Sequence, residues 1–304
     1  MNGQRAIVAV KWGPLQGQKT ILEPGTAKRF GRAEWADFII PHDRQMSGVH
    51  FEVAWDGAAL RVRDLESVTG TLIDGEPGRT EGVIESGSWL KAGETVFTVH
   101  IEGATPPREI ADGPAVPSAA AVAALATLRA EAARAPLFAV LDAARDDRIL
   151  ELLCESVEEH RSLYDGIEGE ALADVAPYLV RLPAGSRLLE ALVLEGFGER
   201  WGIYLTSEEP FKEVRRHLRR FLMVEEEETG SSFYFRFYDP ATLRGFLPTV
   251  TPRQREILFG DLGSFLVEND TELLRFTPTT SEGDEMGRIS RAGAVRGEGA
   301  WRSR

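Results

Sequence analysis

The first third of this 304-residue chain contains Gly31-Arg32, then Ser47-Gly48-Val49-His50, then Ser67-Val68-Thr69-Gly70-Thr71, and after these Asp74-Gly75. Glycine, serine and aspartate favour turns because they tolerate or stabilise tight backbone conformations. The segments around these turns are short, rich in β-branched or aromatic residues, and flanked by Gly, Pro or Asp, as strands are. They are residues 6–10, 38–40, 50–55, 60–64, 71–73 and 95–101. We therefore predict an all-β sandwich over residues 1–103.

In this order and at this spacing, the four elements resemble the forkhead-associated (FHA) domain. The resemblance implies a β-sandwich whose loops at one end bind phosphothreonine. The candidate phosphopeptide-binding residues are Arg32, Ser47, Ser67 and Thr69. The motif residues expected to be structural are Gly31, His50 and Gly70, and the resemblance implies that His50 braces the loop of Ser47.

The chemistry of these residue types suits a phosphate dianion, which needs a fixed cation and several hydrogen-bond donors. Arg32 can offer a planar fork of N–H groups, and the hydroxyls of Ser47 and Ser67 can donate. The chain departs from the family at two positions: Gly48 stands where a basic residue is usual, and Thr69 replaces an asparagine. Two interpretations therefore stay open, a working phosphothreonine pocket or polar residues that only stabilise the fold.

Proline, alanine and charge divide the rest of the chain. Residues 104–135 begin with a proline-rich stretch that reads as a linker and continue as an alanine-rich helix from Ala119, either a spacer or a lead-in. Residues 136–278 form the second domain. It holds 16 basic and 27 acidic residues, whereas residues 1–103 hold 11 and 14. Residues 279–304 are mostly Gly, Ser, Arg and Glu, so we expect a disordered tail.

The second domain alternates two kinds of pattern. Apolar or aromatic runs predict strands at residues 137–141, 178–182, 201–205, 233–238, 264–267 and 273–276. Amphipathic segments between them predict helices that begin near Asp147, Ser186, Asp239 and Thr251, with another around residues 214–222. Asp239-Pro240 and Thr251-Pro252 each place a capping residue before a proline. This alternation predicts an α/β or α+β fold.

Six stretches of this domain, taken in order, resemble the effector-chaperone (adaptor) domain of bacterial type VI secretion systems. They are residues 141–145, 162–166, 176–180, 201–207, 217–220 and 235–240. The resemblance implies a protein that loads a toxic effector onto the VgrG spike protein and is not an enzyme. The first domain would then dock a further component.

Two groups of residues in this domain are candidates for binding a partner. Arginines at helical spacing form a basic stripe: Arg215, Arg216, Arg219 and Arg220. Tyr234, Arg236 and Tyr238 alternate with phenylalanines on the expected strand, and Tyr and Arg are common interface anchors. The arginine stripe is open to two interpretations, a solvated helix face or a docking surface. We expect Arg236 to pair with Asp239 as a structural contact.

Composition narrows the classes of function. The net charge of -13 disfavours a nucleic-acid or anionic-membrane partner. A single cysteine, Cys154, excludes a disulfide framework and fits the cytoplasm; its position in the expected helix predicts a buried side chain. No phosphate-binding loop, nucleophile elbow or metal-ligand spacing occurs, so we expect no catalysis, cofactor or metal. The leading hypothesis is a type VI adaptor; the alternative is a phosphothreonine-dependent signalling module downstream of a Ser/Thr kinase.

Overall fold

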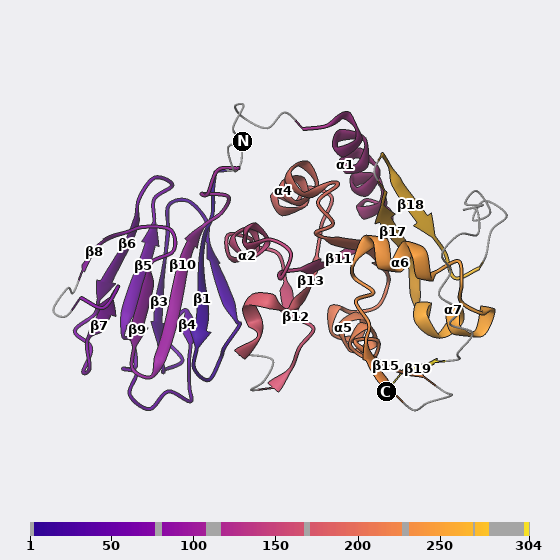
Figure 1. Ribbon diagram of the computed structural model, residues 1–304. Helices are drawn as coiled ribbons and strands as arrows, with labels where there is room; N and C mark the ends of the chain where they lie inside the picture. The colour runs from indigo at the N-terminus through magenta and orange to yellow at the C-terminus, as the bar shows by residue number, and fades with distance from the viewer. Residues whose placement is uncertain are drawn as a thin grey trace. The chain divides into compact units, whose positions relative to one another are not determined.

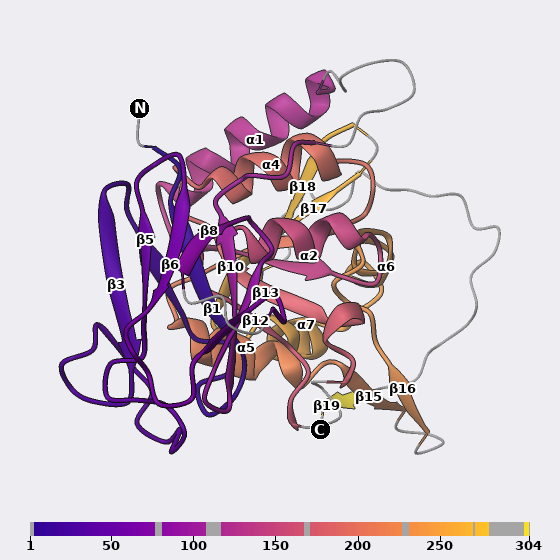
Figure 2. The same cartoon turned by 90° about the vertical axis from the view of Figure 1, so that its left-hand side faces the viewer.

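The computed structural model describes residues 3–76, 81–107, 117–166, 171–226, 231–269, 271–279 and 301–303. The chain divides into two compact units, whose elements are labelled in Figures 1 and 2. Unit 1 comprises Met1–Pro106 with Cys154–Val157, and unit 2 comprises Pro107–Leu153 with Glu158–Arg304. Each unit is described separately below.

Unit 1 is a sandwich of two five-stranded sheets, with strand orders β2-β1-β10-β9-β7 and β4-β3-β5-β6-β8. The first sheet contains β1 (Ala6–Trp12), β2 (Lys19–Leu22), β7 (Thr71–Ile73), β9 (Trp89–Ala92) and β10 (Thr95–Ile101). The second contains β3 (Thr26–Gly31), β4 (Phe38–Ile39), β5 (Phe51–Trp55), β6 (Leu60–Asp64) and β8 (Glu81–Ile84). The all-β sandwich predicted from the sequence is therefore confirmed.

The core of this sandwich lies between the sheets, because the strands bury alternate residues. In β6, Leu60 and Val62 are buried while Arg61 and Arg63 are exposed. Three aromatic rings cross the core. Phe30 stacks on Phe51 at 4.7 Å, and the edge of Phe97 from the opposite sheet meets both rings. Large aromatic groups bury much apolar area per residue, which suits a small sandwich. Strands β2, β3, β8 and β9 were not predicted.

Unit 2 is built on a six-stranded sheet with the order β12-β13-β11-β14-β17-β18, in which every neighbouring pair is antiparallel. The strands are β11 (Leu137–Asp142), β12 (His160–Ser162), β13 (Pro177–Arg181), β14 (Gly202–Ser207), β17 (Leu262–Glu268) and β18 (Leu273–Phe276). The helices are α1 (Ala119–Ala132), α2 (Asp147–Cys154), α4 (Arg187–Gly196), α5 (Phe211–Arg219), α6 (Pro240–Phe246) and α7 (Pro252–Phe259), with the short helix η1 (Ala173–Val175).

Both faces of this sheet are covered by helices, and β11 shows how. Leu137, Ala139 and Leu141 belong to a core with residues of α1, α2 and α4. Phe138 and Val140, which point the other way, belong to a core with residues of α5, α6 and α7. Every residue of β11 is buried, which explains its continuous apolar run. The mixed strand-and-helix fold is confirmed, in its α+β form because the strands are antiparallel.

Helix capping follows the sequence signals. The Asp239 side chain accepts a hydrogen bond from the Thr242 N–H at 2.9 Å, and Pro240 is the first residue of α6. Thr251 and Gln254 form a reciprocal capping box at the start of α7. Ser186 caps α4 through Leu189 N–H. These caps fix where the loops of unit 2 end, and so position the side chains next to them.

Four details differ from the sequence expectations. The strand predicted at residues 233–238 is only β16 (Ser232–Tyr234), and it pairs with β15 (Met223–Glu226), outside the main sheet. The alternation fails because Phe237 and Tyr238 are both buried as the chain turns into α6.

Helix α2 ends at Cys154, whose side chain is exposed and not buried as expected. In the expected disordered tail, residues 280–300 and 304 lie outside the described residues, but Trp301–Ser303 form β19, paired with β15. Backbone pairing along a strand edge requires no large apolar core.

Helix α1 belongs to unit 2. Its residues Ala121, Ala124, Leu125 and Leu128 are buried, and the last three lie in the core beside β11. The alanine-rich segment is therefore a packed lead-in helix, one of the two alternatives. The preceding residues 108–116, expected to be linker, lie outside the described part of the chain.

Candidate functional site

The predicted phosphothreonine site lies on two loops of unit 1, the first between β4 and β5 and the second between β6 and β7, and on Arg32, which directly follows β3. Gly31 brings the end of β3 against the first loop: the Arg32 N–H donates to Ser47 O at 2.9 Å and the Ala33 N–H donates to Gly48 O at 3.0 Å. A Cβ on Gly31 would lie 2.1 Å from Gly48 O. Only glycine permits this approach, which sets Arg32 beside Ser47.

The His50 side chain connects the two loops by hydrogen bonds. It is fully buried; its Nδ1 accepts from the Ser47 N–H at 3.1 Å, so its Nε2–H donates to Gly70 O at 3.0 Å. Gly70 has a φ of +74°, a backbone conformation that glycine adopts freely. His50 and Gly70 thus occupy structural positions, in line with the expectation from the FHA resemblance.

The Ser67 side chain is directed at Asp64 in this structure. Its hydroxyl donates to Asp64 Oδ2 at 2.7 Å and its N–H donates to Oδ1 at 2.8 Å, while the Thr71 hydroxyl donates to Oδ2. Burial alone would raise the pKa of Asp64, but these hydrogen bonds from Thr71 and Ser67 hold that pKa below its usual value. A serine has one hydroxyl hydrogen, and here it is used. In this structure Ser67 therefore braces the loop between β6 and β7.

Arg32, Ser47 and Thr69 meet at the outer surface of the two loops. Arg32 is exposed, and its Nε donates to Met46 O at 3.3 Å, which leaves both terminal nitrogens without a partner among the described residues. Ser47 Oγ accepts from the Val68 N–H at 3.0 Å and keeps its own hydrogen to donate. Thr69 Oγ1 donates to Gln45 O at 3.3 Å, so it links the loops and does not offer its hydrogen outward. The available donors are therefore Arg32 and Ser47.

The sequence did not reveal Asp43, which fixes the first loop. Its side chain is fully buried and accepts from the N–H groups of Gln45, Met46 and Glu94 and from the Thr95 hydroxyl. Four donors satisfy a buried carboxylate well. In the sequence Asp43 is one acidic residue between His42 and Arg44, and an aspartate in such a polar stretch is usually exposed.

Gly48 and its surroundings form the edge of the site. Trp35 is 67% exposed and Val68 is 91% exposed. A Cβ on Gly48 would lie 3.4 Å from the Trp35 ring, an ordinary contact. Position 48 can therefore accept a longer side chain.

The arginine stripe of α5 in unit 2 is divided between structural and surface roles. Arg215 donates to Ser162 O and Tyr164 O, and Arg219 donates to Leu163 O and pairs with Asp165. Burial lowers the pKa of Arg215, with Arg219 adding to the effect. These two residues hold the segment after β12 and so use donors within unit 2. Arg216 is 76% exposed and pairs with Glu213.

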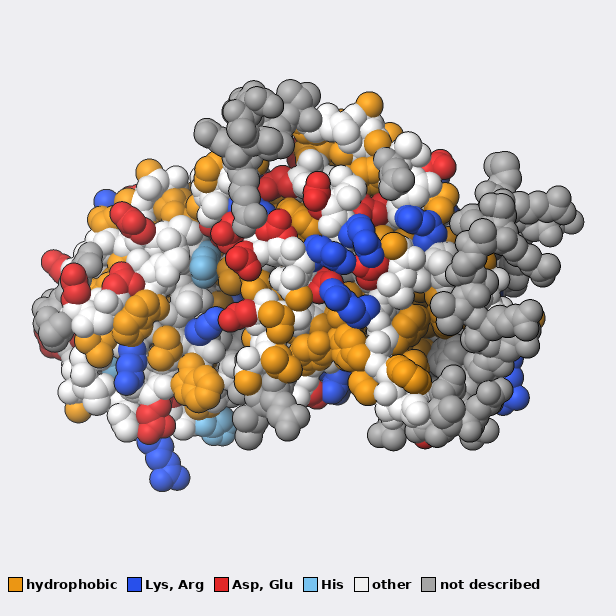
Figure 3. All heavy atoms as spheres, in the orientation of Figure 1, with side chains coloured by type: hydrophobic (Ala, Val, Ile, Leu, Met, Phe, Trp, Pro, Cys, Tyr) orange, Lys and Arg blue, Asp and Glu red, His pale blue; other side chains and the backbone are white. Residues whose placement is uncertain are grey.

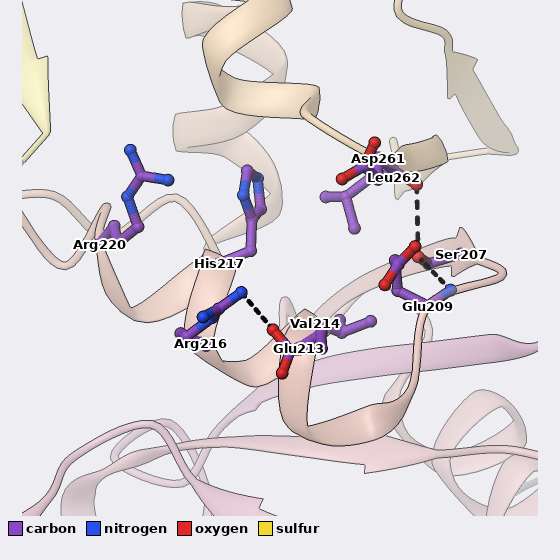
Figure 4. A pocket seen from close by; sticks show the side chains of 9 residues that line it. All are labelled: Ser207, Glu209, Glu213, Val214, Arg216, His217, Arg220, Asp261 and Leu262. Carbon is purple, nitrogen blue, oxygen red and sulfur yellow. Dashed lines mark hydrogen bonds and ion pairs between the residues drawn. The ribbon is translucent and has the colours of Figure 1, made fainter.

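Arg216 and Arg220 line a cavity of about 430 Å³ at the end of the main sheet (Figure 4). The other residues that line it are Ser207, Glu209, Glu213, Val214, His217, Asp261 and Leu262. Arg216 and Glu213 lie on one side, and Ser207, Glu209 and Asp261 lie opposite (Figure 4). The Ser207 hydroxyl donates to Asp261 O at 3.4 Å and accepts from the Glu209 N–H. Because both acidic and basic side chains line this pocket, its lining does not indicate one class of ligand.

The other predicted partner residues surround a buried carboxylate, Asp142 at the end of β11. Arg236 pairs with Asp142, not with Asp239 as expected, and lies over the Tyr238 ring. Tyr238 is buried, so it supports the surface and does not form it. Its hydroxyl is 2.9 Å from that of Tyr234, which is 2.7 Å from that of Tyr164. Burial raises the pKa of Tyr238 to about 12 and also raises that of Tyr234.

Two arginines that sequence reasoning missed meet at Asp239. Arg145 donates to Asp239 Oδ2 at 2.7 Å, and Arg200 donates to both oxygens at 2.7 and 2.6 Å. Although burial opposes it, Arg200 holds the pKa of Asp239 below its usual value. Arg200 itself has a φ of +60°, and its N–H donates to Glu268. Arg145 and Asp239 lie in two of the six stretches used for the family resemblance, but nothing in the sequence pairs them.

The described residues contain no group of three His, Cys, Asp or Glu side chains that could hold a metal ion. Within the same residues, no helix is both long enough and apolar enough to cross a membrane.

Comparison with known proteins identifies both domains. Residues 28–93 match the FHA domain model, and residues 137–256 match the model described as Domain of unknown function (DUF4123). No curated protein matches the chain. It is similar to an FHA domain from a study of phosphothreonine-dependent interactions (26% identity, 34% of this chain, 99% of that chain, TM-score 0.29). It is also similar to the FhaA FHA domain complexed with the intracellular domain of Rv3910 (27% identity, 31% of this chain, 99% of that chain, TM-score 0.28). A further similar structure is the FHA domain of the Chlamydia trachomatis CT664 protein (19% identity, 32% of this chain, 96% of that chain, TM-score 0.30). The chain thus joins an FHA domain to a DUF4123 domain, the domain of the type VI secretion effector-chaperone family.

Proposed function

We propose that this chain is a bacterial type VI secretion adaptor that acts in the cytoplasm. Unit 2 binds a cognate effector and brings it to the VgrG spike protein, without catalysing a reaction. The DUF4123 match over residues 137–256 carries the proposal. Binding keeps an effector's apolar segment covered until transfer, since a contiguous exposed apolar patch promotes association.

Affinity capture of the tagged full-length chain from a type VI-active bacterium tests this role. We expect mass spectrometry to find a VgrG spike protein and a toxin-like effector, both absent from a capture with a tagged unrelated protein. Recovery of neither would overturn the adaptor proposal.

The FHA domain, in this proposal, docks a phosphothreonine-bearing component through Arg32 and Ser47. A phosphate dianion can take the two free terminal nitrogens of Arg32 and the Ser47 hydroxyl hydrogen, all at one edge of the sandwich. The surrounding charge does not help, because residues 1–103 hold more acidic than basic groups. Affinity for phosphate must therefore come from short contacts.

Fluorescence anisotropy with a panel of phosphothreonine peptides tests this docking. Arg32→Ala should weaken binding at least about tenfold, as expected for loss of a charge-assisted fork. Arg63→Ala, on the exposed face of β6, is the matched control and should bind as the wild type does. Gly48→Lys should strengthen binding by adding a cation where the chain has room. Binding of the unphosphorylated peptides with equal affinity would exclude a phosphate site.

The same geometry favours the second candidate function, a signalling module controlled by a Ser/Thr kinase. It differs from the adaptor in one measurable way. Capture of partners would then require kinase activity and would be lost with Arg32→Ala, whereas an effector held by unit 2 would be captured by that variant.

A further inference from the structure

One surface of unit 2 combines exposed arginine and aromatic side chains. We name it the arginine–tyrosine surface, and it consists of Arg145, Arg200, Arg236, Tyr164 and Tyr234. The side chains of Arg145, Arg200 and Arg236 are 32%, 46% and 45% exposed. Tyr234 is 43% exposed and Tyr164 is half-buried. In Figure 3, blue arginine or lysine side chains of unit 2 lie together above a group of orange apolar ones.

The members of this surface are linked by contacts. Arg145 and Arg200 share Asp239, the residue that follows Tyr238. The Tyr238 ring supports Arg236, and its hydroxyl begins the chain of hydroxyls through Tyr234 to Tyr164. Five segments distant in sequence, around residues 142–145, 164, 200, 233–239 and 268, are therefore held in one place.

Charge is separated by depth at this surface. The carboxylates of Asp142 and Asp239 are almost completely buried, at 1% and 3% exposure, while the arginines above them reach solvent. The exposed charges that these three side chains contribute are therefore positive, although residues 136–278 hold 27 acidic and 16 basic residues. Complementary charge would direct an acidic partner to this surface of an otherwise acidic domain.

The three arginines keep unused donors, unlike the structural arginines of the same unit. Arg145, Arg200 and Arg236 each pair with a carboxylate through Nη2 alone, and their Nε and Nη1 atoms have no partner within the part of the chain that the structure describes. Arg215, by contrast, uses both Nε and Nη2 on backbone oxygens. A guanidinium has five N–H donors in a fixed fork, so each of the three can bind a further carboxylate.

We propose that this surface binds an extended effector segment in which aspartate or glutamate residues alternate with an aromatic or large aliphatic residue. The inference rests on the proposed adaptor function and specifies its partner chemistry. The carboxylates bind the free edges of Arg145, Arg200 and Arg236, and the apolar residue packs on the neighbouring rings of Tyr164 and Tyr234. Arg and Tyr are the residue types that contribute most to binding energy when they become buried in an interface.

The test uses the full chain and two fluorescent twelve-residue peptides, one alternating Glu with Phe and one alternating Gln with Phe. Anisotropy should show the Glu peptide binding about tenfold more tightly or better, as expected for charge-assisted contacts to arginine. Arg145→Gln and Tyr234→Ser should each weaken it at least about fivefold, as expected for interface anchors. Neither change exposes a buried charge, because Asp239 keeps Arg200 and the Thr242 N–H.

Arg253→Gln provides the matched control, because Arg253 is an exposed arginine on α7 and is not part of this surface. Equal binding of the two peptides would overturn the proposal, and so would an equal loss of binding in the control. Each variant should unfold at the same temperature as the wild type, and this control shows that a loss of binding is not a loss of folding.

The same variants separate this proposal from the adaptor role. In the affinity capture, the double variant Arg145→Gln/Tyr234→Ser should recover at most about a tenth of the effector recovered by the wild type, for two lost anchors. Wild-type recovery of an effector by the double variant would overturn this surface and leave the adaptor role intact. Preference for the Glu peptide without any captured effector would overturn the adaptor role and leave the surface as an acidic-segment site.

Discussion

Asp142 is a buried carboxylate neutralised by one half-exposed arginine. Its Oδ2 accepts from Arg236, and its Oδ1 has no partner among the described residues. We predict that Arg236→Gln lowers the free energy of unfolding by about 2 kcal/mol, since it leaves a buried charge unpaired. The double variant Asp142→Asn/Arg236→Gln should recover part of this loss. Urea unfolding of these two variants and of Asp142→Asn alone measures the coupling, and strictly additive effects would contradict the pairing.

Ser47 and Ser67 make a second prediction, because the structure separates two serines that the sequence treats alike. Ser47→Ala should reduce phosphothreonine-peptide affinity, since it removes a free donor. Ser67→Ala should leave affinity within about twofold while costing about 1 kcal/mol of stability, the value of one hydrogen bond. Calorimetric titration and urea unfolding check the two effects. A larger affinity loss for Ser67→Ala would restore it as a phosphate ligand.

Individual residues were predictable where one side chain has one local role. Arg32 and Ser47 lie together as the motif spacing indicates, and Asp239 and Thr251 cap helices. Pairings between distant segments were not predictable, because a sequence does not show which carboxylate lies beneath which arginine. Asp239 pairs with Arg200, and the latter reaches it from a loop with a positive φ. Residue type alone gave the wrong partner for Arg236.

Helices α5 and α7 are joined by His217, which carries a prediction about pH. Its Nε2–H donates to Leu258 O at 2.8 Å, and burial lowers its pKa, with Arg220 acting in the same direction and Asp261 opposing it. A neutral histidine in the fold means that the unfolded chain binds more protons below pH 6.5. Stability should therefore fall as the pH drops from 7 to 5.

His217→Gln tests this dependence, because glutamine can still donate a hydrogen bond but does not titrate. Urea unfolding between pH 7 and pH 5 should show a shallower loss of stability for His217→Gln than for the wild type. The same substitution at His42, an exposed histidine of unit 1, serves as the control. An unchanged slope in His217→Gln would mean that other groups cause the acid sensitivity.

Strands and helices with strong patterns were predicted, and weakly patterned ones were missed. Strand β11 is continuously apolar because both of its faces are covered. Strand β3 was missed because four of its six residues are polar or small and exposed or half-exposed. The run at residues 233–238 alternates like a strand, but its last two residues are both buried as α6 begins. Tertiary packing decides such cases against local pattern.

The complete chain has separate hydrophobic cores in its two units, which predicts two unfolding transitions. Leu60 belongs to the core of unit 1 and Leu205 to a core of unit 2. Leu60→Ala should destabilise only the transition of unit 1, and Leu205→Ala only the transition of unit 2. Each substitution should lower the free energy of unfolding of its unit by about 2–5 kcal/mol. Differential scanning calorimetry measures both. A single transition lowered by both substitutions would show that the units unfold as one.

The order of the domains, the sandwich and the mixed fold of unit 2 followed from composition, turn residues and periodicity. The strand order β12-β13-β11-β14-β17-β18 did not, because it depends on contacts between segments far apart in the chain. The net charge of -13 was visible at once, whereas the separation of buried carboxylates from exposed arginines required the structure.

The contact at Gly31 affects how mutational data on this protein should be interpreted. No side chain fits at this position, since even a Cβ would lie 2.1 Å from Gly48 O. In a library selected for phosphopeptide binding, position 31 would therefore tolerate no replacement, as a ligand-contacting residue would. Gly31 offers no side chain to a ligand. Intolerance to substitution here would report the space between two backbone segments, and a search for binding residues would have to set it aside.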